Sequence, residues 1–299
     1  MSAPAHPQPR TLRRTLACLL LAACVGPVLA EDFVYVVQPG DNPWNLTRRY
    51  LKSIDYWPRI QDYNRILEPE TIQPGSTLRI PVAWMRGERG GAQVIDVRGE
   101  VEARSAGRSE ALLPGMRLEP GMQVRSGADS SLTLEFPDGS RSLVGADTTF
   151  GVRKLQRLRA SGAQQLELEL ERGYIENLVN PVRGGGRYII HTPAAVAAVR
   201  GTDFRITAVR DGVRAETLEG EVALRNARGQ TRLPAGRGSY AQRGKLPERS
   251  SDLLPAPELA SLPAVIDRVP FRIPIEPVDG ALRYRTQLAP AGGFTVLAS

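Results

Sequence analysis

Cysteine and histidine are almost absent from this chain of 299 residues. The two cysteines, Cys18 and Cys24, both lie near the N-terminus, and there are two histidines, of which His191 is the one beyond the first thirty residues. A disulfide framework needs cysteines spread along the fold, and a structural zinc site needs several Cys or His ligands. The composition therefore argues against a disulfide-stapled fold, a Cys–His nucleophile and a multi-histidine metal site, and we expect neither metal nor cofactor.

Aromatic residues are also scarce, at 6%, whereas the chain contains 29 glycines and 24 prolines. This balance favours turn-rich β structure over a helical bundle. With 41% hydrophobic and 24% charged residues, the sequence is in the globular range and is long enough for two or three small domains. We therefore expect a multidomain, mainly β protein.

The first thirty residues lack acidic side chains and have the pattern of an export signal. Arg10, Arg13 and Arg14 precede the apolar stretch from Leu16 to Val25, which is too short to span a bilayer. Val28-Leu29-Ala30 then supplies small residues typical of a cleavage site. We predict a signal peptide over residues 1–30 and localisation in the periplasm or cell envelope. Its removal lowers the formal charge from +7 to +4, which gives no reason to expect nucleic-acid binding.

A second mode of export is encoded in the same segment. Leu21-Ala22-Ala23-Cys24 resembles the lipobox of bacterial lipoproteins, in which the cysteine becomes the lipidated N-terminus. The apolar run continues from Val25 to Leu29 and favours conventional cleavage after residue 30. Membrane attachment is expected only if Cys24 is lipidated.

Residues 33–82 show the pattern strand, helix, helix, strand. An alternating apolar run from Phe33 to Val37 stops at Pro39-Gly40, and Asp41 or Asn42 can then cap a helix. Trp44, Leu46 and Tyr50 are expected to form the apolar face of this first helix. The second helix and the closing strand are indicated by Trp57, Ile60, Tyr63, Asn64 and the run Thr77 to Pro81.

This segment resembles a LysM domain. The resemblance is carried by Tyr35, Val37, Gly40, Asp41, Trp44, Leu46, Asn64, Pro74, Gly75, Leu78, Ile80 and Pro81. LysM domains bind N-acetylglucosamine-containing glycans, such as peptidoglycan, in a shallow groove between two loops. The resemblance implies one wall at Gly40, Asp41, Asn42 and Pro43 and a second wall at Ile66, Leu67, Pro69 and Ile72.

Structural roles are open for several of these residues. In the alternative to glycan binding, Asp41 serves only to cap the helix, and Trp44 and Ile72 are only core residues. The sequence also departs from the usual LysM pattern at Asn42 and Pro43, where a hydroxyl residue and an aliphatic residue are more typical. A single module is expected to bind weakly without additional contacts.

The middle of the chain reads as β structure. Residues 83–93 are rich in Gly and Arg and are predicted to be a linker. From residue 94 to residue 245, short alternating strands recur between turn signals such as Pro137-Asp138-Gly139-Ser140 and Asp211-Gly212. We predict an all-β domain over residues 94–245.

This all-β segment resembles the FecR family. The motif residues that carry the resemblance most specifically are Thr192, Pro193, Arg200, Gly201 and Thr202, and we expect their role to be structural. FecR proteins of iron uptake combine such an extracytoplasmic domain with a membrane helix and a cytoplasmic anti-sigma segment. Here a signal peptide and a LysM-like module stand before it, so we expect a scaffold or protein-contact domain and no direct anti-sigma activity.

The C-terminal part begins with a proline-rich linker, predicted over residues 246–263. Beyond it, the run from Pro277 to Gln287 looks like the opening strands of a fibronectin type III or other Ig-like domain. Residues 264–299 are too few for a complete sandwich of seven strands. The segment is predicted to be either the start of such a domain or a short β appendage.

Catalytic groups are scarce, and no catalytic residue is predicted. A Ser-His-Asp triad would depend on His191, which is expected to be a strand residue. The sequence thus predicts a non-enzymatic, peptidoglycan-binding scaffold or sensor with an unknown envelope protein as its second partner. Two alternatives stay open, a protein that recruits a separate cell-wall enzyme and a wall hydrolase that uses a pair of carboxylates.

Overall fold

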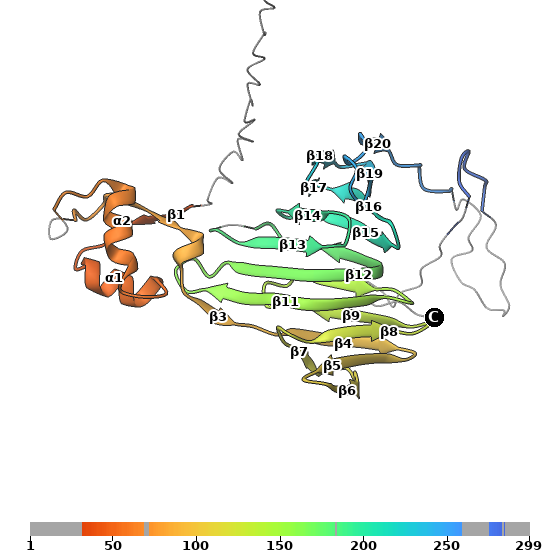
Figure 1. Ribbon diagram of the computed structural model, residues 1–299, viewed down its shortest axis with the longest axis horizontal. Coiled ribbons are helices and arrows are strands. Elements are labelled where there is room, and N and C mark those ends of the chain that lie inside the picture. Colours follow the sequence, from red (N-terminus) through yellow and green to blue (C-terminus); the bar gives the residue numbers. More distant parts are fainter. Residues whose placement is uncertain (1–31, 69–71, 183, 259–274, 283, 285–299) are drawn as a thin grey trace, which may run out of the picture. The chain divides into compact units, whose positions relative to one another are not determined.

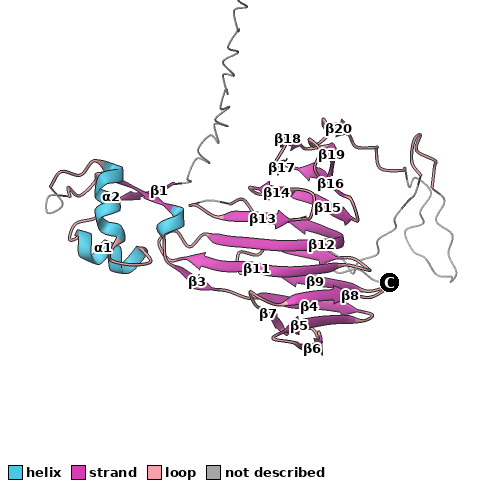
Figure 2. Cartoon of the chain, viewed as in Figure 1, coloured by secondary structure: helices cyan, strands magenta, loops and turns pink. Residues whose placement is uncertain are grey.

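The structure, a computed structural model, describes residues 32–68, 72–182, 184–258, 275–282 and 284 (Figure 1). The predicted signal peptide, Cys24, Pro69 and most of segment 264–299 lie outside these residues. Strands predominate in the described chain, and the α-helices are confined to its N-terminal module (Figure 2). The prediction of a small helix-containing module followed by an all-β region is confirmed.

The N-terminal module has the predicted order of strand, helix, helix and strand. Strand β1 (Asp32–Val36) pairs antiparallel with β2 (Thr77–Pro81), with Phe33 opposite Ile80. Between them lie helices α1 (Pro43–Tyr50) and α2 (Tyr56–Asn64). The helices cover the two-stranded sheet and bury one core, which includes Val37, Leu46, Tyr50, Ile60, Leu78 and Ile80.

The prediction that Trp44 belongs to the apolar face of α1 is wrong. Its side chain is 60% exposed, whereas Leu46, Thr47 and Tyr50 are buried. Successive helical residues are rotated by about 100°, so Trp44 lies on the opposite side of the helix from Leu46. Three apolar residues over about two turns did not distinguish these faces in the sequence.

The linker predicted over residues 83–93 is also wrong. This segment forms the 3₁₀ helix η2 (Val82–Trp84), strand β3 (Gly87–Arg89) and the start of β4 (Ala92–Arg98). Met85 is fully buried in the core of the N-terminal module and bridges to Leu51. The glycines that suggested a flexible segment lie at close approaches instead: a Cβ on Gly87 would lie 2.7 Å from the Gln156 side chain.

The β-rich region contributes directly to the core of the N-terminal module. Leu158, on strand β11 (Thr149–Leu158), is fully buried in that cluster, and Ala160 and Ala163 pack against it. Strand β3 pairs antiparallel with β11, with Gly87 opposite Leu158. The chain therefore passes from module to β region through continuous packing and hydrogen bonding.

The β-rich region consists of two sheets whose pairings close into a ring. Sheet I contains β3, β5, β6, β8, β11, β13, β14, β17 and β18, and sheet II contains β4, β7, β9, β10, β15, β16, β19 and β20; β12 belongs to both. The remaining bounds are β5 (Val101–Ser105), β6 (Arg108–Ala111), β7 (Arg117–Leu118), β8 (Gln123–Ser126), β9 (Ser131–Glu135), β10 (Arg141–Val144), β12 (Gln164–Leu178), β13 (Arg187–His191), β14 (Val196–Val199), β15 (Asp203–Val209), β16 (Gly212–Glu219), β17 (Glu221–Asn226), β18 (Gly229–Pro234), β19 (Arg237–Gln242) and β20 (Ser251–Asp252).

Strand β12 crosses from one sheet to the other at Gly173. Its first part pairs with β11 and, in parallel, with β13, and its second part pairs with β10 and β15. Gly173 has φ +97°, and a Cβ there would collide with the Thr148 side chain. Only glycine meets both conditions, which explains how one strand of fifteen residues can serve two sheets.

Alternate residues of the two sheets meet in one apolar core. Phe136, Tyr188 and Phe204 form T-shaped ring contacts at its centre, with centroids 6.1 Å apart in each pair. The Tyr188 hydroxyl is buried but bonded, since it donates to Asn177 Oδ1 at 2.7 Å. Alternation along the strands therefore sends apolar side chains inward and leaves polar ones on the outer faces.

The C-terminal predictions are tested only in part. Within the predicted linker 246–263, β20 pairs with β19, so its first part is ordered against sheet II. Residues 275–282 and 284 contain a turn at Asp279-Gly280, and no strand occurs among them. Among the residues that the structure describes, no helix has the length and apolarity needed to cross a membrane.

Candidate functional site

The loop between β1 and α1 is held in shape by Asp41. Its carboxylate accepts hydrogen bonds from the Tyr35 hydroxyl and from the Gln38 backbone N–H, each at 2.7 Å. Burial is the main cause that raises the pKa of the Tyr35 phenol, and the bond to Asp41 adds to it. Gly40, with φ +87°, supplies the left-handed backbone that the turn requires.

Asn42, not Asp41, is the N-cap of α1. The Asn42 side chain accepts from the Asn45 N–H at 2.9 Å, and the Asn45 side chain accepts from the Asn42 N–H at 3.0 Å, which forms a reciprocal capping box. Pro43 occupies the first turn, where its missing N–H leaves no bond unmade. The departure from the usual LysM pattern at Asn42 and Pro43 thus gives a well-capped helix start.

Backbone hydrogen bonds join the end of β1 to the end of the loop that precedes β2. At the end of β1, the Val37 N–H donates to Ser76 O at 2.9 Å, and the Gly75 N–H donates to Val37 O at 2.8 Å. The loop of Gly40 to Pro43 therefore starts beside the end of the loop that joins α2 to β2. Gly75, with φ +86°, turns this second loop into β2.

The second wall has an apolar anchor and an exposed tip. Ile66 and Ile72 are half-buried and pack against the core of the module. Leu67 between them is 95% exposed. Pro69 lies outside the described residues. Ile66 and Ile72 thus position the loop, and Leu67 is available to a ligand.

Asn64 explains why an amide ends the second helix. Its Nδ2 donates to the carbonyls of Ile60 and Arg79, and its Oδ1 accepts from the Arg79 N–H, so it fastens α2 to β2. Beside it, the Asp32 carboxylate accepts from the Tyr63 hydroxyl and from Arg79. These bonds raise the pKa of both Tyr63 and Arg79. Together, these hydrogen bonds hold the two-stranded sheet against α2.

Trp44 is the residue of this region that sequence reasoning missed. It follows Pro43 in the first turn of α1 and exposes 60% of its side chain. An exposed indole next to a loop is a common surface for sugar C–H faces. The available signal was the helical period, which places Trp44 away from Leu46 and Tyr50.

The FecR-like motif residues form two turns of the β region. Thr192 closes the turn between β13 and β14, where its hydroxyl donates to Ala195 O at 2.7 Å. Gly201 has φ +88°, and a Cβ on it would lie 2.6 Å from Pro181 Cα. Thr202 exchanges two backbone hydrogen bonds with Val179. Pro193 and Arg200 are exposed beside these turns. A structural role for the motif stays a prediction.

The single histidine of the described residues lies in a strand, as predicted. His191, in β13, has its Nε2 3.3 Å from Glu167 Oε2, and both side chains are half-buried on the outer face of sheet I. Nowhere in the described part of the chain do three or more potential metal-ligating side chains come together. His191 is thus paired with Glu167 on the surface of the sheet.

Comparisons with known proteins cover parts of the chain. An uncharacterized protein of Deinococcus radiodurans is 42% identical over 50 residues, which are 17% of this chain and 20% of that protein. Two crystal structures of a putative anti-sigma factor from Parabacteroides distasonis align with 16% identity, TM-scores of 0.37 and 0.36, and coverage of 44% of this chain and 59% of the other. The chain thus spans a fifth of the first relative and less than two thirds of the second.

The family comparisons match both regions described above. Residues 35–81 match the LysM domain family, and residues 122–223 match the family described as FecR protein. The first range covers the module from β1 to β2, and the second runs from the start of β8 into β17. The chain thus combines a LysM domain with a FecR region, as its sequence predicted.

Proposed function

We propose that this protein is a non-enzymatic component of the cell envelope that binds peptidoglycan through the LysM module. The observation that carries the proposal is the pair of loops at one end of the module, each fixed by hydrogen bonds or core packing, with apolar side chains left exposed beside them. Gly40, Asp41, Asn42 and Pro43 form one wall, and Ile66, Leu67, Pro69 and Ile72 form the other.

The chemistry of the loops suits an N-acetylglucosamine unit. Backbone N–H and C=O groups of both loops bond the acetamide, and the exposed Trp44 and Leu67 side chains cover its methyl group and the sugar C–H faces. Asp41 acts indirectly, because its carboxylate already accepts two bonds that shape the loop. No proton transfer or nucleophile is required.

The FecR region is proposed to act as a scaffold or sensor that contacts another envelope protein. Packing of Leu158 in the same cluster as Met85 supports this role, since it connects the FecR region directly to the LysM module. Recruitment of a separate wall enzyme is the second candidate, and it rests on the same packing. A wall hydrolase that uses a pair of carboxylates is the remaining alternative, and no observation on the described residues favours it.

Co-sedimentation with purified peptidoglycan tests the proposal. The double variant Trp44→Ala/Leu67→Ala removes two exposed side chains, so it leaves the core intact and is expected to weaken binding by about tenfold or more, given the 0.5–1.5 kcal/mol typical of one aromatic contact. Ile54→Ala is the matched control, because Ile54 is 41% exposed in the same module but lies between α1 and α2.

The result is clear in either direction. Wild-type binding that the double variant loses and Ile54→Ala keeps supports the proposal. Absence of binding by the wild-type protein, or equal binding by all three, contradicts it. Release of soluble fragments from labelled peptidoglycan by the purified protein would instead favour the hydrolase.

A further inference from the structure

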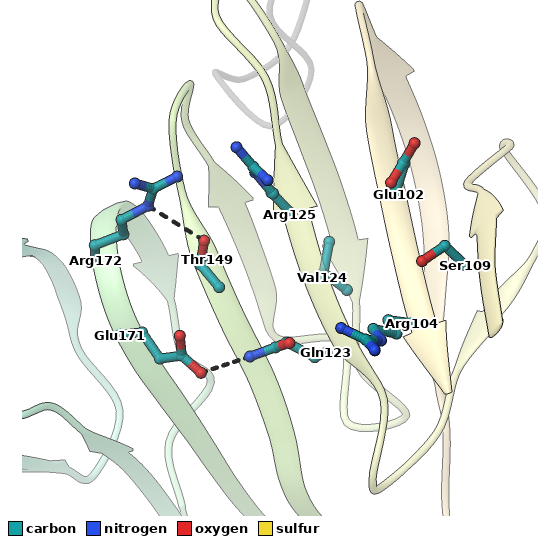
Figure 3. A pocket seen from close by; sticks show the side chains of 9 residues that line it. All are labelled: Glu102, Arg104, Ser109, Gln123, Val124, Arg125, Thr149, Glu171 and Arg172. Carbon is teal, nitrogen blue, oxygen red and sulfur yellow. Dashed lines mark hydrogen bonds between the residues drawn. The ribbon is translucent and has the colours of Figure 1, made fainter. Parts of the chain in front are cut away.

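The outer face of sheet I carries a hollow. Its lining residues lie outside the LysM module. Its volume is about 520 Å³, and it is lined from strands β5, β8, β11 and β12 (Figure 3). A second hollow of about 220 Å³ adjoins it, since Gln123 and Glu171 line both. Together they form one groove, within the size range of sites that hold small ligands.

Gly151 leaves the floor of this groove open. It lies in the middle of β11, opposite Gln123 of β8 and Glu169 of β12. Its φ is not positive, and the nearest atom to an added Cβ would be Met122 O at 3.5 Å, an ordinary contact. Neither the backbone nor packing therefore requires glycine here, although glycine weakens a strand and often marks the close approach of a ligand.

Three arginines line the groove without a carboxylate partner among the described residues. Within the described part of the chain, the Arg104 and Arg125 side chains make no ion pair or hydrogen bond, and Arg172 Nε donates one hydrogen bond, to the Thr149 hydroxyl at 3.4 Å. Figure 3 shows Arg125 between Arg172 and Glu102. The pairing register explains this row, because Arg125 stands opposite Glu102 on one side and Thr149 on the other.

The neighbouring carboxylates differ in whether they accept a side-chain hydrogen bond. Glu171 accepts a 2.5 Å hydrogen bond from Gln123 Nε2 and is thereby held at the groove wall. Glu102 lies beside the arginines and is exposed to a ligand. Glu169 also lines the groove, where its carboxylate lies 3.9 Å from the Arg153 guanidinium. Among the described residues, the lining groups left without a charged partner are therefore three guanidinium groups and the Glu102 carboxylate, which complement a ligand with carboxylates and an amine.

The lining chemistry distinguishes a peptide from a sugar. No aromatic side chain lines the groove, so it lacks the stacking surface that sugar rings use. Guanidinium groups bind carboxylates through paired, charge-assisted hydrogen bonds, and Gln123, Ser109 and Thr149 can bond peptide groups. The site therefore suits a short peptide with free carboxylates better than a neutral glycan.

We propose that this groove binds the carboxylate-bearing stem peptides of peptidoglycan. The inference rests on the proposed function, because these peptides are attached to the glycan strands that the LysM module would bind. Arg104, Arg125 and Arg172 bind the carboxylates, and Glu102 binds the amine. Two weak sites on one polymer reinforce each other, which a single LysM module cannot do alone.

Titration of the full chain with two soluble probes tests the proposal. The probes are stem peptides released from purified peptidoglycan by an amidase and an N-acetylglucosamine oligomer. The double variant Arg125→Gln/Arg172→Gln is expected to lower stem-peptide affinity by about tenfold or more, as loss of charge-assisted bonds does. Arg214→Gln is the charge control, because Arg214 is exposed on β16 of sheet II.

A second variant tests the groove without changing its charge. Gly151→Val fills the floor with a residue that suits a strand, so it is expected to abolish stem-peptide binding while the melting temperature stays equal or rises. Ala223→Val adds bulk to the outer face of sheet I on β17 and serves as its control.

The outcomes separate this proposal from the previous one. Loss of stem-peptide binding in both groove variants, with oligomer binding unchanged, supports the groove. No stem-peptide binding by the wild type, unchanged binding by the variants, or equal binding of a polyglutamate peptide of the same length overturns it. Failure of the oligomer alone to bind contradicts the LysM proposal and leaves stem-peptide binding to be judged on its own arm.

Discussion

The LysM module and the β region are stabilised in different ways. The module has a small core, and hydrogen bonds of the Asp41, Asn64 and Asp32 side chains also stabilise it. The β region relies on strand pairing and one large core, with Tyr188 bonded inside it. A small domain buries too little apolar surface to depend on its core alone. The module leaves Trp44 and Leu67 exposed, and polar contacts support the loops beside them.

Strand β11 lets this comparison be tested with two matched substitutions. Leu155 and Leu158 lie three residues apart on the same strand and are both buried, but Leu155 belongs to the β core and Leu158 to the module core. Truncation to alanine is expected to cost about 2–5 kcal/mol in either case. Leu155→Ala should lower the stability of the β region, and Leu158→Ala should lower that of the module.

Hydrogen exchange resolved by residue measures where each loss appears. We expect Leu158→Ala to speed exchange at the amides of α1 and β2, and Leu155→Ala to speed it in β8 and β12. Identical exchange patterns for the two variants would mean that module and β region unfold as one unit. In that case the division into two cores has no energetic meaning.

The sequence predicted the element order of the module and the β character of the rest, because alternation, capping and turn residues are local signals. Trp44 was misplaced since two helical turns define a face poorly. The junction at residues 83–93 was missed for a different reason. Its glycines serve close packing against Gln156 and other side chains, which depends on contacts between residues about seventy positions apart.

The site residues that could be predicted were also those with local sequence signals. Gly40, Asp41 and Asn42 were recognised because the family motif is contiguous, but the choice of Asn42 as the cap needed the geometry. The groove on sheet I was not foreseen. Arg104, Arg125 and Arg172 are far apart in sequence, and only the register of β5, β8, β11 and β12 makes them neighbours.

Alkaline pH should weaken the β region through Tyr188. Burial raises the pKa of its phenol above the ordinary value of 10.0. Above pH 10 the unfolded chain loses this proton while the folded chain keeps it, so the stability that is fully present below pH 10 declines as the pH rises, by up to about 1.4 kcal/mol per pH unit.

The variant Tyr188→Phe should make the free energy of unfolding less sensitive to alkaline pH than in the wild type. At pH 7 it is less stable than the wild type, because it loses the bonds to Ser142 and Asn177. Between pH 10 and 11.5 its stability should fall less steeply. Urea unfolding at several pH values measures both effects, and parallel declines in the two proteins would show that Tyr188 does not govern the alkaline loss.

The smallest expected effect concerns the corresponding tyrosine of the module. Tyr35→Phe removes the 2.7 Å bond to Asp41 and is expected to cost about 1 kcal/mol, the usual net value of one hydrogen bond. Because Asp41 also accepts from the Gln38 N–H, the loop keeps one of its two supports. We therefore expect faster hydrogen exchange at the Asp41 amide and weaker binding to peptidoglycan, with the β region unchanged.

Tyr63→Phe is the control, since it removes a bond to Asp32 on the sheet side of the module. If Tyr35→Phe alters hydrogen exchange in the β region as much as in the loop, the bond between Tyr35 and Asp41 does not stabilise the loop alone. The two regions would then not be stabilised independently of each other.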